Sequence, residues 1–212
     1  MNTSSLHKSK NSPPSGAGGL VIINYGAGNI QSIKFAIQRL GYEAILSDDV
    51  EEIKAADKVI FPGVGEASSA MKKLKDSGLN ALIPQLKQPV LGVCLGMQLM
   101  CNSSEEGKTK GLGIFNVDVV KFSDRLKVPQ IGWNQIMGLK SSLFEGISEK
   151  EYIYMVHSFY APLCKETIAQ SEYGLNYSAA LQKANFYGTQ FHPEKSSGVG
   201  EHILNNFLNL KR

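Results

Sequence analysis

Cysteines are scarce in this sequence and form no pattern. There are three among 212 residues, an odd number that argues against a framework of disulfides and is typical of the reducing cytoplasm. They do not combine with histidines at the spacings of metal ligands, so we infer no structural or catalytic metal. The sequence therefore predicts a cytoplasmic protein held together by its core.

Long apolar runs and basic clusters are also missing. No run is long enough to span a membrane. The formal charge is only +3, and the lysines are scattered rather than interleaved with aromatic residues, so we expect neither a membrane nor a nucleic acid as partner. Residues 1–19 are rich in Ser, Asn, Lys, Pro and Gly. This composition predicts a flexible tail, and the lack of an apolar stretch argues against a secretory signal.

What the sequence does contain is an alternation of strand and helix signals. Apolar runs at 20–24, 59–61 and 90–93 are typical of buried strands, and apolar residues recur at helical spacing at 29–40 and near 71–74. Such βαβ alternation implies a parallel sheet with helices on both faces.

Beyond Gly113 the sequence pattern changes and predicts short strands linked by turns, followed by a last helix near 199–210. We therefore predict one domain over residues 20–212. Its expected fold is α/β, a doubly wound, mainly parallel sheet flanked by helices, with additional short antiparallel strands in the C-terminal half.

Cys94 stands at the junction of a strand and a helix. It follows the apolar run 90–93 and precedes a run of helix formers, with Gly92 and Gly96 on either side. This order predicts a nucleophile elbow, in which glycines allow close backbone approach or positive φ. A helix N-terminus favours the thiolate, which is the nucleophilic form. The alternative is a buried, inert cysteine, and the flanking glycines favour the nucleophile.

A cysteine nucleophile needs a base, and His192 has the most persuasive context. It follows a strand-like run at 185–191 and precedes Pro193 and Glu194. In an extended backbone, residues two apart point to the same face, so Glu194 can accept a hydrogen bond from the His192 ring. Pro193 cannot donate to a sheet ladder, so we expect the strand to end there. Both side chains would then lie at the carboxyl edge, where open α/β sheets place their sites.

A glycine-containing loop at 61–66 follows another predicted strand. Its glycines permit backbone amides to point outward and stabilise an oxyanion, and the amide of Leu95 is a second natural donor. The loop lacks the endings and spacings of a phosphate-binding loop, and the turn at 25–29 lacks the third glycine of a dinucleotide site. We therefore expect no cofactor. Asn29 is a plausible N-cap for the helix that follows.

These residues resemble the class I glutamine amidotransferases, whose triad is a cysteine in such an elbow with a distant His-Pro-Glu. Four segments, one of them containing that His-Pro-Glu, are similar to the glutaminase subunits of imidazole glycerol phosphate synthases. They are Asn24–Asn29, Pro129–Asn134, Tyr154–Phe159 and Phe191–Ser196. The resemblance runs from about Leu20 to the C-terminus.

The resemblance implies a function and further site residues. It implies hydrolysis of glutamine to glutamate and ammonia by Cys94, His192 and Glu194. The ammonia would pass to a (βα)₈-barrel cyclase subunit, the partner in a heterodimer that makes imidazole glycerol phosphate in histidine biosynthesis. The resemblance adds Gly63 and Val64 to the oxyanion hole. It also assigns glutamine contacts to Gln98, His157, Ser158 and Phe159, and partner contacts to Asn29, Trp133, Tyr154 and Lys195.

Three departures from the family pattern leave alternatives open. Asn24 replaces an acid, Gln130 stands where histidine is frequent, and Phe159 where tyrosine is common. One alternative is a paralogous ammonia-donating subunit for amidation of a surface sugar. Others are a stand-alone thiol hydrolase of γ-glutamyl compounds and a catalytically silent scaffold subunit. The intact triad argues against the scaffold.

Overall fold

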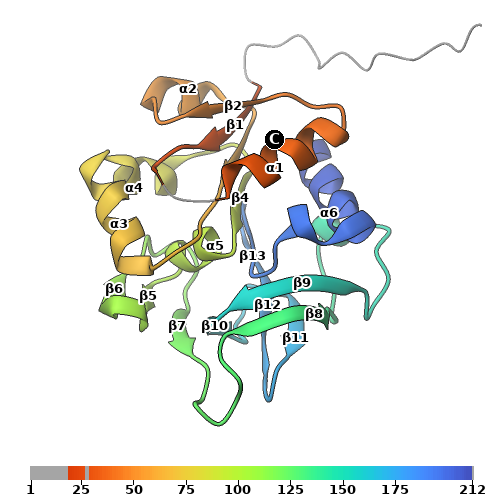
Figure 1. Cartoon of the computed structure of the whole chain (residues 1–212). Coiled ribbons are helices and arrows are strands. Elements are labelled where there is room, and N and C mark those ends of the chain that lie inside the picture. Colours follow the sequence, from red (N-terminus) through yellow and green to blue (C-terminus); the bar gives the residue numbers. More distant parts are fainter. Residues whose placement is uncertain (1–18, 27–28, 212) are drawn as a thin grey trace, which may run out of the picture.

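Strands and helices alternate through the first half of the chain (Figure 1). The structure, a computed structural model, describes residues 19–26 and 29–211. The elements of this half are β1 (Leu20–Ile23), α1 (Ile30–Arg39), β2 (Ala44–Ser47), α2 (Val50–Ala55), β3 (Lys58–Phe61), α3 (Ala67–Asp76), α4 (Leu79–Leu82), the 3₁₀ turn η1 (Ile83–Gln85), β4 (Val90–Val93) and α5 (Leu95–Leu99).

Short strands dominate the second half until a final helix. They are β5 (Ser103–Ser104), β6 (Thr109–Lys110), β7 (Asp118–Lys121), β8 (Gln130–Gln135), β9 (Tyr152–His157), β10 (Phe159–Pro162), β11 (Thr167–Glu172), β12 (Asn176–Lys183) and β13 (Phe186–Thr189). Three 3₁₀ turns, η2 (Glu106–Lys108), η3 (Ser142–Phe144) and η4 (Pro193–Lys195), lie among them, and α6 (Ser197–Asn209) follows.

The main sheet is parallel in one half and mostly antiparallel in the other. The strands β2, β1, β3, β4 and β13 lie side by side in that order, all parallel. From β13 the sheet continues antiparallel through β12 and β10 to β7, and β11 also pairs with β12. A separate antiparallel pair, β8 and β9, forms a second small sheet. The sheet order places the last strand, β13, directly beside β4.

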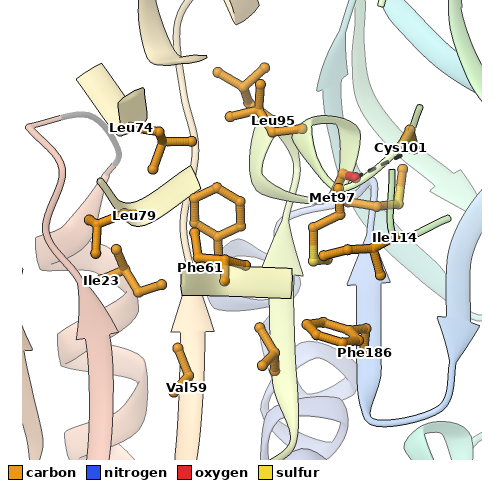
Figure 2. Packing of buried hydrophobic residues seen from close by; sticks show 14 of the residues in the cluster. Ile23, Val59, Phe61, Leu74, Leu79, Leu95, Met97, Cys101, Ile114 and Phe186 are labelled. Atoms are coloured by element: carbon orange, nitrogen blue, oxygen red, sulfur yellow. Dashed lines mark hydrogen bonds between the residues drawn. The ribbon is translucent and has the colours of Figure 1, made fainter. Parts of the chain in front are cut away.

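Apolar side chains pack on both faces of the parallel strands. Successive residues of a strand point to opposite faces, and β3 follows this rule: Val59 and Phe61 pack with α3 and α4, whereas Ile60 packs with α1 and α6. Figure 2 shows the first of these clusters, with Phe61 near Leu74 and Leu79. Burial of both faces explains the continuous apolar runs in the sequence.

The predicted α/β architecture is confirmed, including the antiparallel strands of the C-terminal half. One boundary was wrong. The strand before His192 ends at Thr189 rather than at Pro193, because the chain turns into η4. The predicted tail, residues 1–19, lies outside the described residues except for Gly19. In the part that is described, none of the helices has the length and apolar character to cross a bilayer; the cytoplasmic location stays a prediction.

Candidate active site

A cleft of about 380 Å³ opens at the carboxyl ends of β3 and β4. Its lining comes from segments far apart in the sequence: Val64, Gly65, Cys94, Leu95, Gln98, Glu106, Pro129, Val156, His157, Ser158, Phe159, His192 and Lys195. The volume is within the range of sites for small ligands. The cleft therefore contains the predicted nucleophile, the predicted base and all four expected substrate contacts.

Cys94 forms the turn between β4 and α5. Its backbone has φ 54° and ψ −110°, a strained conformation for a residue with a side chain. Neither flanking glycine has a positive φ; both are needed because there is no room for a side chain. A Cβ on Gly96 would lie 2.1 Å from the carbonyl oxygen of Phe61, and one on Gly92 would lie 2.8 Å from the amide of Met97. The strain is on the cysteine itself, and the glycines allow strand, turn and helix to approach closely.

His192 and Glu194 form a buried pair beside this turn. His192 Nδ1 lies 2.8 Å from Glu194 Oε1, and both side chains are almost completely buried. Burial alone lowers the pKa of His192. Hydrogen bonding with Cys94 and with Glu194, together with their negative charges, outweighs burial and raises the pKa well above its usual value. Near neutral pH the pair thus favours the imidazolium form of His192.

The geometry that brings Glu194 to His192 differs from the predicted one. We expected an extended backbone, but Pro193–Lys195 form a 3₁₀ turn. The turn is fastened to β9: the amide of His192 donates to the carbonyl of Tyr154 at 3.1 Å, and Ser196 Oγ both accepts from the amide of Tyr154 and donates to the carbonyl of His192. These bonds hold His192 in place from the neighbouring sheet.

The glycine-containing loop after β3 packs directly on the start of α5. A Cβ on Gly63 would lie 2.4 Å from the amide of Gly96, so a side chain there would force the loop away from Cys94 and the start of α5. Val64, Gly65 and Leu95 line the cleft. Tyr25 fastens the start of the loop, because its hydroxyl donates to the carbonyl of Pro62 at 2.9 Å.

The four expected substrate contacts all lie in the cleft wall. Gln98 Nε2 lies 2.9 Å from the carbonyl of Phe159 and 2.9 Å from Gln190 Oε1. His157 Nδ1 lies 2.7 Å from the same carbonyl. Burial lowers the pKa of His157 to about 4, more than the hydrogen bond to Phe159 raises it. His157 is therefore neutral near pH 7, and an imidazole with so low a pKa is a weak base, unsuited to serve as a second catalytic base.

Comparison with known proteins agrees with this geometry. The family model for glutamine amidotransferase class-I matches residues 21–210. The chain belongs to the class I glutamine amidotransferase family. A curated relative, imidazole glycerol phosphate synthase subunit HisH of Bacteroides fragilis, is 55% identical over 90% of this chain and 99% of its own length. The HisH subunit of Colwellia psychrerythraea is 47% identical over 90% of this chain and 92% of its own.

Solved structures share the fold of this amidotransferase at much lower sequence identity. A putative GMP synthase subunit from Thermoplasma acidophilum superposes with a TM-score of 0.70 at 20% identity, covering 91% of this chain and 93% of its own. PurLQS from Thermotoga maritima gives 0.68 at 16% identity, covering 91% and 98%. The predicted fold class and enzyme class are thus both confirmed.

Three of the four expected partner contacts lie together on the surface of the amidotransferase. Trp133 on β8 stands opposite Tyr154 on β9, with ring centroids 6.1 Å apart, and Lys195 Nζ lies 6.0 Å from the Tyr154 ring. Ile131 and Tyr152, on the same face of this small sheet, are also exposed. We call these five residues the aromatic face. More than half of the Trp133 surface is open to solvent, so this tryptophan is not a core residue.

Asn29 belongs to another element, the start of α1. It occupies the N-cap position as predicted, but its side chain does not accept from a backbone amide of the first turn. Instead its Oδ1 accepts from Ser32 Oγ at 3.0 Å. The backbone at Asn29, with ψ 64°, departs from the extended conformation that a capping side chain requires.

Sequence reasoning missed two polar residues of this amidotransferase site. Glu106, in a short 3₁₀ turn, lines the cleft and accepts from the amide of Ala67 at 2.9 Å. Burial and the nearby Glu66 outweigh that bond and raise the pKa of its carboxyl group. Gln190 lies beside the sulfur of Cys94. The position of Gln190, two residues before His192, could have indicated a place near the site. The sequence around Glu106 contains no comparable signal.

Proposed function

We propose that this chain hydrolyses glutamine with a triad of Cys94, His192 and Glu194. We also propose that it delivers the ammonia to a (βα)₈-barrel cyclase subunit that makes imidazole glycerol phosphate in histidine biosynthesis. The observation that carries the proposal is the placement of Cys94, on a strained elbow, beside the buried His192–Glu194 pair in one cleft. The HisH names of the relatives support the choice of pathway.

The first half of the reaction consumes the charge pair. The thiolate of Cys94 attacks the side-chain amide carbon of glutamine, and the carbonyl oxygen becomes an oxyanion. His192 then gives its proton to the departing nitrogen, so that the C–N bond breaks, ammonia leaves and a thioester remains. Glu194, hydrogen-bonded to the opposite ring nitrogen, holds the imidazole in the tautomer and direction that this transfer needs.

The second half restores the charge pair. His192, now neutral, takes a proton from water as the oxygen attacks the thioester carbon. The C–S bond breaks, and thiolate and imidazolium are regenerated. The new carboxyl group releases the second proton of the water to solvent, and glutamate leaves. In both halves the oxyanion needs donors fixed where its charge develops, and we assign these to the amides of Leu95 and of the Gly63–Val64 loop.

The remaining lining residues suit the amino-acid end of glutamine. Glu106 supplies a carboxylate on one wall of the cleft, where it can pair with the substrate's ammonium group. Ser158 and Phe159 supply backbone groups on another wall. Gln98 has its amide nitrogen committed to Phe159 and Gln190, so its contact with substrate would be through Oε1.

The aromatic face suits a permanent partner. Ammonia is protonated in neutral water and is then no nucleophile, so it must pass directly to a second active site. Exposed Trp and Tyr with a neighbouring cation are typical anchors of protein interfaces. The aromatic face is also connected directly to the proposed base, because the backbone carbonyl of Tyr154, a member of the face, accepts a hydrogen bond from the amide of His192. This supports a synthase subunit over a stand-alone thiol hydrolase, and the HisH relatives support it over a surface-sugar paralogue.

Cys94→Ala in the complex with the cyclase subunit tests this function. We expect glutamine-dependent synthesis to be abolished and ammonia-dependent synthesis to remain, because Cys94 serves only to release ammonia. Cys164→Ala is the matched control, since Cys164 is a free thiol that does not line the cleft, and both activities should persist. Substantial use of glutamine by Cys94→Ala would remove the nucleophile assignment. Loss of both activities in that variant would contradict the proposal that this chain only releases ammonia and the cyclase subunit carries out the synthesis.

A further inference from the structure

Gln190 is a buried glutamine that the steps above do not use. Strands β4 and β13 pair in parallel, with Val93 opposite Thr189 and the amide of Cys94 bonded to the carbonyl of Thr189. The next residue after Thr189 therefore stands beside Cys94. Gln190 has no exposed surface, and its Nε2 lies 3.7 Å from Cys94 Sγ.

The direction of the Gln190 amide follows from its neighbours. The carbonyl of Phe159 can only accept a hydrogen bond, so the Gln98 atom 2.9 Å from it is the nitrogen. The same nitrogen lies 2.9 Å from the Gln190 side chain, which must therefore present its oxygen there. The Gln190 nitrogen is left facing Cys94 Sγ. One backbone carbonyl thus fixes the orientation of both amides.

An amide nitrogen in this position distinguishes the two forms of the sulfur. It can only donate, and a thiolate is a much stronger acceptor than a thiol. The carbonyl of Val156, 3.8 Å from Sγ, can only accept a hydrogen bond and so interacts favourably with the thiol alone. The donor also keeps its proton throughout the reaction, whereas His192 gives its proton away when ammonia leaves.

We propose that Gln190 is a positioning residue, which holds the sulfur of Cys94 and favours its thiolate by donating a hydrogen bond whose direction is set by Gln98 and the Phe159 carbonyl. This inference rests on the proposed role of Cys94 as the nucleophile. It assigns to Gln98 a second task besides substrate contact. It also explains why a polar side chain occupies a fully buried place next to the elbow.

The test is the rate at which iodoacetamide alkylates Cys94 in the full-length chain, without glutamine, across a series of pH values. Mass spectrometry of the Cys94 peptide separates this thiol from Cys101 and Cys164. Gln190→Met keeps the size of the side chain and removes the donor. Gln88→Met is the matched control, because Gln88 is also buried and donates to a backbone carbonyl, that of Ile53, far from the cleft.

We expect Gln190→Met to slow alkylation at pH 7 by about tenfold or more, the effect of losing a hydrogen bond to a charged group. The rate should rejoin that of the wild type at alkaline pH, where the thiol ionises without help. The pH profile should be unchanged in Gln88→Met. In the complex, kcat for glutamine should fall in Gln190→Met with KM little affected. A Gln190→Met profile that superposes on the wild type in a folded protein overturns the proposal.

Gln98→Met carries the same test if Gln190→Met does not fold. It frees the Gln190 amide to rotate, so the profile should move in the same direction by a smaller amount, and an unchanged profile overturns the proposal. Failure of the proposed function is recognised separately. That failure appears as glutamine use by Cys94→Ala, whereas the alkylation profile involves neither glutamine nor the partner.

Discussion

The imidazole of His157 donates from Nδ1 to the carbonyl of Phe159 across 2.7 Å. A carbonyl cannot donate, so this contact fixes the tautomer and leaves Nε2 as the acceptor, and Nε2 has no hydrogen-bond partner among the described residues. The ring packs against Phe122 and Tyr177, with centroids 5.3 and 5.4 Å away. The second histidine of the cleft is thus built to stay neutral, in contrast to His192.

The free energy of unfolding at acid pH should depend on the neutral state of His157. Burial lowers the pKa of His157 to about 4, whereas in the unfolded chain it is near 6.5. Between those two pH values the unfolded state binds the proton and the native state does not. The free energy of unfolding therefore falls as the pH falls from about 6.5 to about 4, and the total loss is up to about 3 kcal/mol. Urea unfolding at pH 7 and pH 4.5 measures the loss, which should be smaller in His157→Phe.

His202→Gln is the control for that experiment, because His202 is an exposed histidine on α6. Its acid-induced loss of stability should equal that of the wild type. An equal loss in His157→Phe would mean that His157 is protonated in the native state at those pH values.

The His192–Glu194 pair predicts an unequal effect of two substitutions. Glu194→Gln can still accept a hydrogen bond from Nδ1 but loses the charge that stabilises the imidazolium, whereas His192→Ala removes the proton carrier. We expect both to lower kcat for glutamine hydrolysis in the complex, Glu194→Gln by less. Ammonia-dependent synthesis is the internal control and should change in neither. Negligible effects of both substitutions would refute the assignment of base and orienting group.

The cyclase partner should control the glutaminase rate. We expect the isolated chain to hydrolyse glutamine slowly and the partner, especially with its own substrate bound, to accelerate hydrolysis. The Gly63–Gly65 loop is the natural switch, since glycine peptides reorient at low steric cost and loss of one oxyanion donor lowers turnover by about 10²–10³-fold. Glutamate release, with and without equimolar partner and ligand, measures this. If the free chain already works at the rate of the complex, a stand-alone thiol hydrolase becomes the better interpretation.

The aromatic face predicts where the partner binds. Trp133→Ala should weaken binding of the cyclase subunit by about 2 kcal/mol or more, as is typical for a central aromatic anchor. Leu163→Ala, which truncates an exposed apolar residue outside this face, should leave the affinity unchanged. Titration calorimetry with the purified partner compares the two. Equal affinities of both variants and the wild type would place the interface elsewhere.

Much of the site could be predicted because its reactive residues lie within short, recognisable sequence segments. The elbow around Cys94 and the His-Pro-Glu run each combine special residues within a few positions, so local patterns were sufficient. Glu106 could not be found in this way, since its place in the site depends on a contact with Ala67, which is distant in sequence. Gln190 stands close to His192 in the sequence, but its contact with Cys94 depends on the pairing of two distant strands. The separate β8–β9 sheet likewise depends on pairing between segments that propensity does not connect.

The neighbour relation of β4 and β13 has a consequence for synthesis on the ribosome. Cys94 leaves the ribosome about a hundred residues before His192, and until residues 186–189 emerge, β4 has β3 on one side and an unpaired edge on the other. An open apolar edge invites pairing with other chains. The nascent polypeptide therefore carries the thiol of Cys94 for nearly half of its length without His192, and the proposed triad can assemble only when the last strand has been inserted.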